Sequence, residues 1–160
     1  MSSKKVSSAD NQQERLEIKS WIIGFVDGEG SFLISIFRNK TTKSGWQVFP
    51  EFVVSQGAKS LNALKMIRKF FRCGAIFINR RHDNHHQDIY RYCVRSLKDL
   101  IEKIIPFFEK HRLMTAKRKD FIQFKRIVKL MKNGNHLKSV GFKKIKQITL
   151  TMNRKGNKNL

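Results

Sequence analysis

The sequence has no uninterrupted apolar stretch near the roughly 18 residues that a membrane-spanning helix requires, so we expect no transmembrane segment. Its two cysteines, Cys73 and Cys93, are too few for a disulfide framework and form no CxxC pair, which favours a reducing compartment. Residues 1–12 lack the apolar core of a secretory signal, and we interpret them as a mobile polar tail. We expect one domain over residues 13–153, followed by a basic tail over residues 154–160.

Acidic residues are also scarce. The chain has 12 Asp and Glu against 34 Lys and Arg, which gives a net charge of +22 and an isoelectric point near 10.5. An excess of this size indicates a polyanionic partner, and nucleic acid is the leading candidate over an anionic lipid surface or a merely soluble basic protein. From Phe121 to Leu160 there is no acidic residue and there are eleven Lys or Arg, so this end, including Lys143 and Lys144, is expected to bind phosphates. A solvated basic tail is the alternative.

The histidines do not follow a zinc-finger spacing. His82, His85 and His86 with the two cysteines match no established ligand pattern, and we interpret the histidines as loop surface.

The remaining composition, 40% hydrophobic and 11% aromatic over 160 residues, indicates a packed globular domain. Apolar spacing and turn residues predict a buried helix from Asn11, a hairpin, a second helix with Gly74 as its left-handed stop, a second hairpin, a helix that Pro106 ends, and C-terminal helices. The predicted strands are Ser31–Asn39, Gln47–Ser55, Ala75–Arg80 and Ile89–Arg95, and the later helices are Ser60–Arg72, Ser96–Ile104, one from Thr115 to Gly134 and one through Phe142 and Met152. The order is αββαββα, an α+β class.

The end of the first helix is unusual. Gly24 and Gly28 lie on one helical face, although each glycine costs about 1 kcal/mol in helix propensity. Close approach of another backbone would explain them. The alternative is that this helix packs through its glycines on its own sheet.

Residues Ile22–Gly30 resemble the LAGLIDADG motif of homing endonucleases. Gly24, Asp27 and Gly30 match it, Gly28 replaces the alanine, and Glu29 replaces the second acidic residue while keeping a carboxylate. The similarity extends over roughly Glu14–Asn153. It implies the LAGLIDADG fold, with a four-stranded antiparallel DNA-binding saddle, and motif helices that pack together at a two-fold axis through Ile23, Gly24, Asp27 and Gly28. Because the motif occurs once in this sequence, we expect a homodimer.

The resemblance also implies a metal-dependent site. Glu29 is the expected ligand, with the Gly28 carbonyl oxygen, and Mg²⁺ is the expected ion, although Mn²⁺ or Ca²⁺ could occupy the same oxygens. Gln56 is expected to hold water near the metal, or else only to cap its strand. Lys117 is the expected basic catalytic residue, with Lys119, Arg118 and Lys59 as alternatives. Asp27 is expected to bind backbone donors at the interface and not the metal.

Strand alternation predicts which residues face DNA. Phe32, Ile34 and Ile36 should face the helices, which leaves polar residues on the open face together with apolar members such as Phe37, Phe49 and Val53. Those apolar residues indicate either contacts with thymine methyl groups or incomplete amphipathicity. The predicted DNA-binding residues are Ser31, Ser35, Asn39, Gln47, Glu51, Ser55, Asn79, Arg80, Arg81, Arg91 and Arg95.

Together these features predict a sequence-specific, homodimeric homing endonuclease. It would hydrolyse one phosphodiester in each strand of double-stranded DNA at a long, near-palindromic site and so promote intron mobility. An intron RNA-binding maturase and a non-cleaving DNA-binding protein are the alternatives, and the carboxylate at position 29 favours cleavage. Lysine-, isoleucine- and asparagine-rich usage is typical of an A·T-rich organellar genome, in a chloroplast or mitochondrion.

Overall fold

The computed structural model of the chain describes residues 8–80 and 88–152. Six α-helices, four strands and short 3-10 and π segments follow one another in this part of the chain. They are α1 (Ser8–Glu29), β1 (Gly30–Arg38), β2 (Trp46–Gly57), η1 (Ala58–Ser60), α2 (Leu61–Phe71), β3 (Ala75–Asn79), β4 (Ile89–Val94), α3 (Leu97–Asp99), η2 (Leu100–Ile104), α4 (Ile105–Lys110), α5 (Lys117–Lys132), η3 (Asn135–Leu137) and α6 (Ser139–Leu150). The predicted αββαββα order with C-terminal helices is confirmed.

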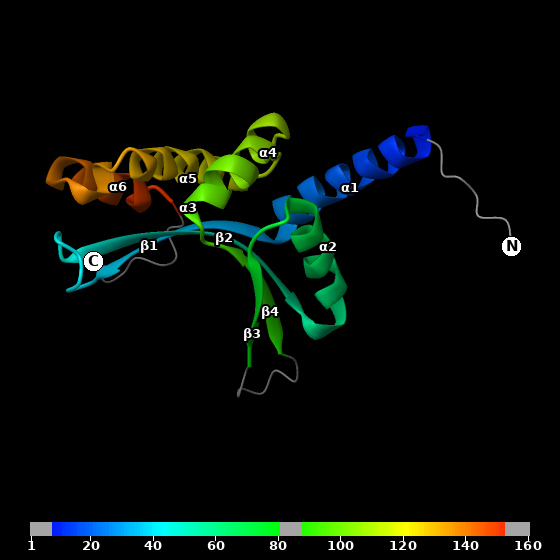
Figure 1. Cartoon of the computed structure of the whole chain (residues 1–160), viewed down its shortest axis with the longest axis horizontal. Helices are drawn as coiled ribbons and strands as arrows, with labels where there is room; N and C mark the ends of the chain where they lie inside the picture. Colours follow the sequence, from blue (N-terminus) through cyan, green and yellow to red (C-terminus); the bar gives the residue numbers. More distant parts are fainter. Residues whose placement is uncertain (1–7, 81–87, 153–160) are drawn as a thin grey trace, which may run out of the picture.

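The four strands form one antiparallel sheet in the order β1-β2-β4-β3. The helices lie over one side of this sheet, and the β3–β4 hairpin bends away from the β1–β2 hairpin, which gives the sheet a saddle-like curve (Figure 1). The register pairs Phe32 with Phe52 and Phe52 with Val94, so these three side chains share a face. All three are buried, and this is the face that the helices cover.

The core lies between the sheet and the helix layer. Phe32 is at its centre, with ring centroids 5.2 Å from Phe52, 5.5 Å from Phe108, 5.1 Å from Phe121 and 5.4 Å from Phe124. Stacked, tilted and edge-on aromatic contacts of this kind add to the free energy gained from burial. The core therefore fixes α4 and α5 on the sheet, and with them the segment between these helices.

Three helix boundaries differ from the predictions. The first helix begins at Ser8, so that five residues assigned to the polar tail, 8–12, belong to α1. Pro106 does not end a helix: α3, η2 and α4 run on without a break over Leu97–Lys110, and the wider π turn Leu100–Ile104 directly before Pro106 accommodates a residue that has no N–H. At the end of α2, Arg72 takes the left-handed conformation (φ 51°), and Gly74 (φ 75°) follows as a second left-handed residue.

Gly74 is nevertheless required. A Cβ atom at this position would lie 2.6 Å from the Cys93 carbonyl oxygen and 2.8 Å from the Tyr92 ring, so only glycine allows β3 to start this close to β4. Within the described residues, no helix has the length and apolar character needed to cross a membrane.

Candidate active site and nucleic-acid interface

The chain passes from α1 into β1 without a loop, and Gly30 makes this possible. A Cβ atom on Gly30 would lie 2.6 Å from the Val26 side chain and 2.9 Å from the Val26 carbonyl oxygen, closer than side chains tolerate. The absence of a side chain at Gly30 therefore lets the strand leave directly from the last helical turn. As a result, Asp27, Gly28 and Glu29 lie together at the edge of the sheet, where the α1 carbonyl groups have no helical partners.

Asp27 joins this junction to the segment before α5. Its Oδ2 atom accepts a hydrogen bond from the Met114 N–H (2.7 Å), and its carboxylate also accepts from the Thr115 N–H (3.2 Å) and hydroxyl (2.6 Å). Burial by itself would raise the pKa of Asp27, but these hydrogen bonds, with the nearby Lys117 charge, lower the pKa below its ordinary value. As predicted, Asp27 binds backbone donors, but these donors belong to its own chain.

Lys117, the first residue of α5, extends across to the same junction. Its Nζ atom donates hydrogen bonds to the Gly28 carbonyl (2.9 Å) and to the Val26 carbonyl (3.0 Å). Its backbone N–H lies 3.3 Å from the Thr115 hydroxyl oxygen. Desolvation lowers the pKa of Lys117, and the carboxylates of Asp27 and Glu29 oppose this shift only in part. The junction therefore holds an ammonium group directly beside the last carbonyls of α1.

Glu29 differs from its neighbours. It is exposed, and its carboxylate makes no hydrogen bond or ion pair with any residue of 8–80 or 88–152. A free carboxylate next to a backbone carbonyl offers the hard oxygen ligands that Mg²⁺ and Ca²⁺ prefer, so these residues fit a divalent cation. The described part of one chain contains no cluster of three His, Cys, Asp or Glu residues that could bind a metal. A complete site would need further ligands, such as a second copy of Glu29 and the phosphate oxygens.

The other predicted catalytic residues differ in their distance from this junction. Gln56 is half-buried near the end of β2, and the register that pairs Gly30 with Val54 places it beside the last turn of α1. Alternation puts Gln56 on the helix-covered side of the sheet, with Val54. Lys119 and Lys59 are exposed, and among the described contacts only Lys117 donates to the α1 carbonyls. The geometry thus favours Lys117 over these two lysines.

The glycine face of α1 has no partner within its own chain. A Cβ atom on Gly24 or Gly28 would have no described atom within 4 Å, so the alternative that these glycines serve packing on the chain's own sheet is wrong. Apolar side chains on the same helix are also exposed, including Leu16 at 50% and Trp21 at 36%, and Ile23 is half-buried. The face is therefore suited to contact a further backbone.

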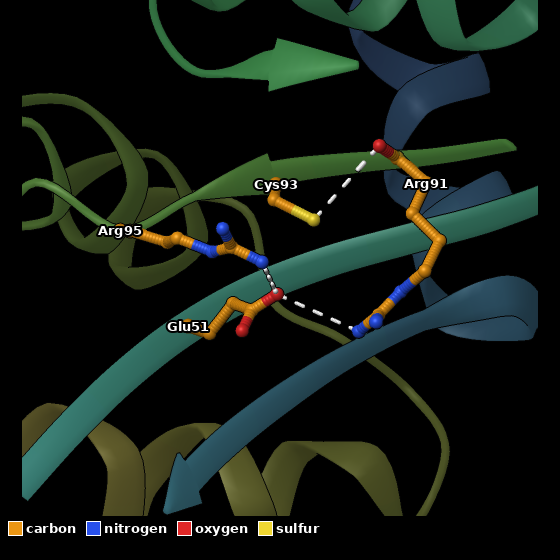
Figure 2. Close-up of polar contacts among 4 residues, drawn as sticks. All are labelled: Glu51, Arg91, Cys93 and Arg95. Carbon is orange, nitrogen blue, oxygen red and sulfur yellow. Dashed lines mark hydrogen bonds and ion pairs between the residues drawn. The ribbon is translucent and has the colours of Figure 1, made fainter. Parts of the chain in front are cut away.

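The open face of the sheet carries the predicted DNA-binding residues. Ser35 is exposed, and Ser31 and Ser55 are half-buried. Two predictions need correction: Glu51 and Val53, expected to be exposed, are 9% and 3% exposed. Arg91 and Arg95 account for the burial of Glu51, because both guanidinium groups bind its carboxylate, as Figure 2 shows.

Other residues assigned to DNA lie around this face. Asn39 and Gln47 bind each other, with the Asn39 Nδ2 atom donating to the Gln47 Oε1 atom at 2.7 Å, and so they close the β1–β2 turn. Asn79 and Arg80 are exposed at the end of β3. Lys143 and Lys144 are exposed on α6, which lies with α5 in the helix layer (Figure 1). Arg81 and the three histidines of the zinc alternative lie outside the described residues.

Two residues of this arrangement were not predicted from the sequence. Thr115 was interpreted only as the start of a helix, but its hydroxyl group links Asp27 to the start of α5. Cys93 is 2% exposed on the open face, and burial next to Glu51 raises the pKa of its thiol to about 11. Neither contact has a sequence signal, because both depend on how distant segments meet.

Comparisons with known proteins agree with this geometry. The profile of the LAGLIDADG endonuclease family matches residues 22–128. A probable intron-encoded endonuclease of Neurospora crassa is 37% identical over 140 residues, which are 86% of this chain but 25% of that protein. The chain thus spans about a quarter of that curated relative.

Solved structures are similar over most of the chain. The homing endonuclease I-TnaI is 41% identical, with a TM-score of 0.75 over 84% of this chain and 87% of that one. I-SmaMI, bound to an uncleaved DNA target in the presence of calcium ions, is 29% identical, with a TM-score of 0.76 over 84% of this chain and 44% of that one. The motif at the end of α1, the saddle-shaped sheet and these matches together show that the chain belongs to the LAGLIDADG endonuclease family.

Proposed function

We propose that this chain forms half of a sequence-specific double-strand DNA homing endonuclease, and that two copies assemble through the glycine face of α1. The observation that carries the proposal is the junction at Glu29. There, an unpaired carboxylate and the Lys117 ammonium group meet at the end of a helix whose glycine face is open. Two-fold packing of that face would bring two such junctions together, one for each DNA strand.

Glu29 and the Gly28 carbonyl oxygen are the proposed ligands of a divalent cation, for which Mg²⁺ is the first candidate. Once bound, the cation supplies activation of water and neutralisation of charge on the scissile phosphate. Two Glu29 carboxylates close together would repel each other unless a cation lies between them. The cation would therefore be the partner that the Glu29 carboxylate lacks within one chain.

Lys117 is proposed to stabilise the negative charge that develops on the phosphate or to orient the attacking water. Its hydrogen bond to the Gly28 carbonyl keeps a positive donor at the junction before the cation binds. Because that carbonyl is also a proposed cation ligand, the ammonium group would turn from the carbonyl toward the phosphate when the cation binds. Asp27 and Thr115 are proposed to hold Lys117 there, since they bind the segment that starts α5. Gln56 is proposed to order water at the neighbouring strand end.

The open face of the saddle is proposed to lie in the major groove. A β-ribbon fits this groove, and arginine pairs bidentately with guanine there. The exposed lysines of α6 are proposed to bind flanking phosphates, which gives affinity without sequence preference. The intron-encoded relative supports a role in intron mobility, and we propose an organellar genome as the source.

Cleavage of a randomised duplex library, with every cut end sequenced, tests the proposal. The wild-type chain should cut one near-palindromic site with Mg²⁺ and should not cut with EDTA. Glu29→Gln should still bind that site but not cut it. Glu102→Gln removes an exposed carboxylate outside α1, in the π segment η2, and should leave cutting unchanged. Equal cutting by the wild type and Glu29→Gln would refute the metal site, and selective binding of intron RNA without any cutting would favour a maturase.

A further inference from the structure

Glu51 occupies an unusual position for an acidic residue. Within the described ranges it is the only charged side chain that is buried, at 9% exposure, and it lies on the open face of the sheet, the face proposed to read DNA. An exposed carboxylate on this face could accept a hydrogen bond from a cytosine amino group. Buried as it is, Glu51 cannot serve as such a direct contact, and its role must lie in what it binds within the protein.

Two arginines from β4 and its end converge on this carboxylate. The Arg95 Nη2 atom lies 3.2 Å and the Arg91 Nη2 atom 3.5 Å from the same Glu51 Oε1 atom. Figure 2 shows the two guanidinium groups approaching the carboxylate from opposite sides. Arg95 is held further by aromatic rings, with its guanidinium carbon 4.7 Å from the Phe77 centroid and 5.6 Å from the Phe49 centroid.

The contact redirects Arg91. The register places Arg91 opposite Ser55 and Cys93 opposite Val53. Glu51 lies four residues before Ser55 in β2, so it is not the residue directly opposite Arg91. To reach Glu51, the Arg91 side chain extends along the sheet instead of straight out from it (Figure 2). Val53 and Cys93 pair with each other between these two positions on the same face, and they are only 3% and 2% exposed.

Both arginines keep N–H donors that do not bind Glu51. Each contributes one nitrogen atom to Glu51, and a guanidinium group has five N–H donors. The two side chains remain 36% and 41% exposed, so part of each stays accessible on the open face. A buried carboxylate without a cationic partner is strongly unfavourable, and here two arginines share that role. The trio carries a net charge of +1 instead of the +2 of two free arginines.

We propose that Glu51 is a positioning residue that determines specificity: it fixes Arg91 and Arg95 as one ordered set of donors for guanine edges and reduces their attraction to phosphates. The inference rests on the proposed function, since it requires that the open face reads duplex DNA. Long flexible arginines would otherwise bind any nearby phosphate, which adds affinity for all sequences and discrimination for none. The ion pairs with Glu51 on β2 restrict both arginine side chains, so that their N–H donors point in fixed directions.

The test compares Glu51→Gln with Glu109→Gln. The first exchange keeps the size of the side chain and removes its charge. Glu109 binds Lys125 and Lys129 in the helix layer, so its replacement makes the same change in net charge away from the open face. Both variants and the wild type would be bound to a randomised duplex library and sequenced, with binding to the selected site and to random duplex measured over a range of salt concentrations.

Glu51→Gln should lose roughly tenfold of the base preference at a few positions in each half-site, the discrimination expected from one bidentate pair. It should bind random duplex more tightly than Glu109→Gln does. Arg95→Lys, which keeps the charge but not the planar fork, should lose preference at the same positions. A Glu51→Gln profile equal to that of Glu109→Gln, or a loss of affinity that is uniform over all sequences, would overturn the inference. A wild-type chain that selects no DNA site would overturn the proposed function instead.

Discussion

Replacement of Gly24 by leucine should have opposite effects on folding and on function. Within the chain, a Cβ atom at Gly24 has no described atom within 4 Å, so a larger side chain meets open space. Leucine is a far better helix former than glycine, and the exchange should stabilise α1 by roughly 0.8 kcal/mol. For a chain of 160 residues this corresponds to an increase of roughly 2–3 °C in the melting temperature of the unassociated protein.

Association should respond in the reverse direction. If two α1 helices approach each other at Gly24, two-fold symmetry places two added side chains in the same contact. Overpacking typically costs about 1–3 kcal/mol for each site, and even the lower limit, doubled by symmetry, weakens the dimer about 30-fold. DNA cutting should fall with it, because each chain supplies only one Glu29.

Sedimentation and denaturant unfolding at low protein concentration separate the two effects. Gln147→Leu on α6, an exposed site in the helix layer at the opposite end of the sheet from α1 (Figure 1), is the matched control for association and should leave association unchanged. A Gly24→Leu protein that associates and cuts like the wild type would show that the glycine face is not the dimer contact. A protein less stable than the wild type at low concentration would show that Gly24 serves the chain's own packing.

Two further substitutions test the junction. Lys117→Met should lower the cleavage rate about 100-fold or more with little loss of DNA affinity, as expected for a group that acts on developing charge. Lys119→Met is the control and should leave the cleavage rate unchanged. Single-turnover cleavage measures the rate, and filter binding measures the DNA affinity. Asp27→Asn loses acceptors for the Met114 and Thr115 donors and should cost about 2 kcal/mol, or roughly 4–8 °C in melting temperature. Because the pKa of Asp27 is lowered in the folded chain, its charge stabilises the fold above about pH 4 and this contribution is lost as the pH falls further. The difference between wild type and Asp27→Asn should therefore shrink in melting scans below about pH 4, and a constant difference would argue against the charge.

The sequence predicted the fold well because two periodicities were clear. Alternation placed Phe32 in the core and Ser35 on the open face, and helical spacing placed Phe121 and Phe124 on the buried side of α5. Pro106 was misjudged because its effect depends on the preceding π segment, which no local residue preference reveals. Helix ends that depend on hydrogen-bond geometry, such as the left-handed Arg72, were also beyond prediction by residue type.

The candidate site could be predicted only where its residues are close together in the sequence. Gly24, Asp27, Gly28 and Glu29 lie within six residues, so helical spacing relates them directly. The link to Lys117 spans 89 residues from Gly28 and depends on how α5 packs on the core. Thr115 could not be found in this way, since a threonine before a helix is an ordinary capping residue.

Glu51 shows the limit of alternation most clearly. Strand alternation assigned Glu51 correctly to the open face. Alternation predicts the side of the sheet to which a side chain points, but it does not predict which other side chains cover it. On a face that carries arginines of the next strand, a lone carboxylate attracts them, and they then bury it. On a basic saddle such as this one, an acidic residue between arginines is first a partner of the protein's own cations. It becomes a candidate for base contact only where no arginine can reach it, and in this sheet Arg91 reaches it from a position four residues away along the strand direction.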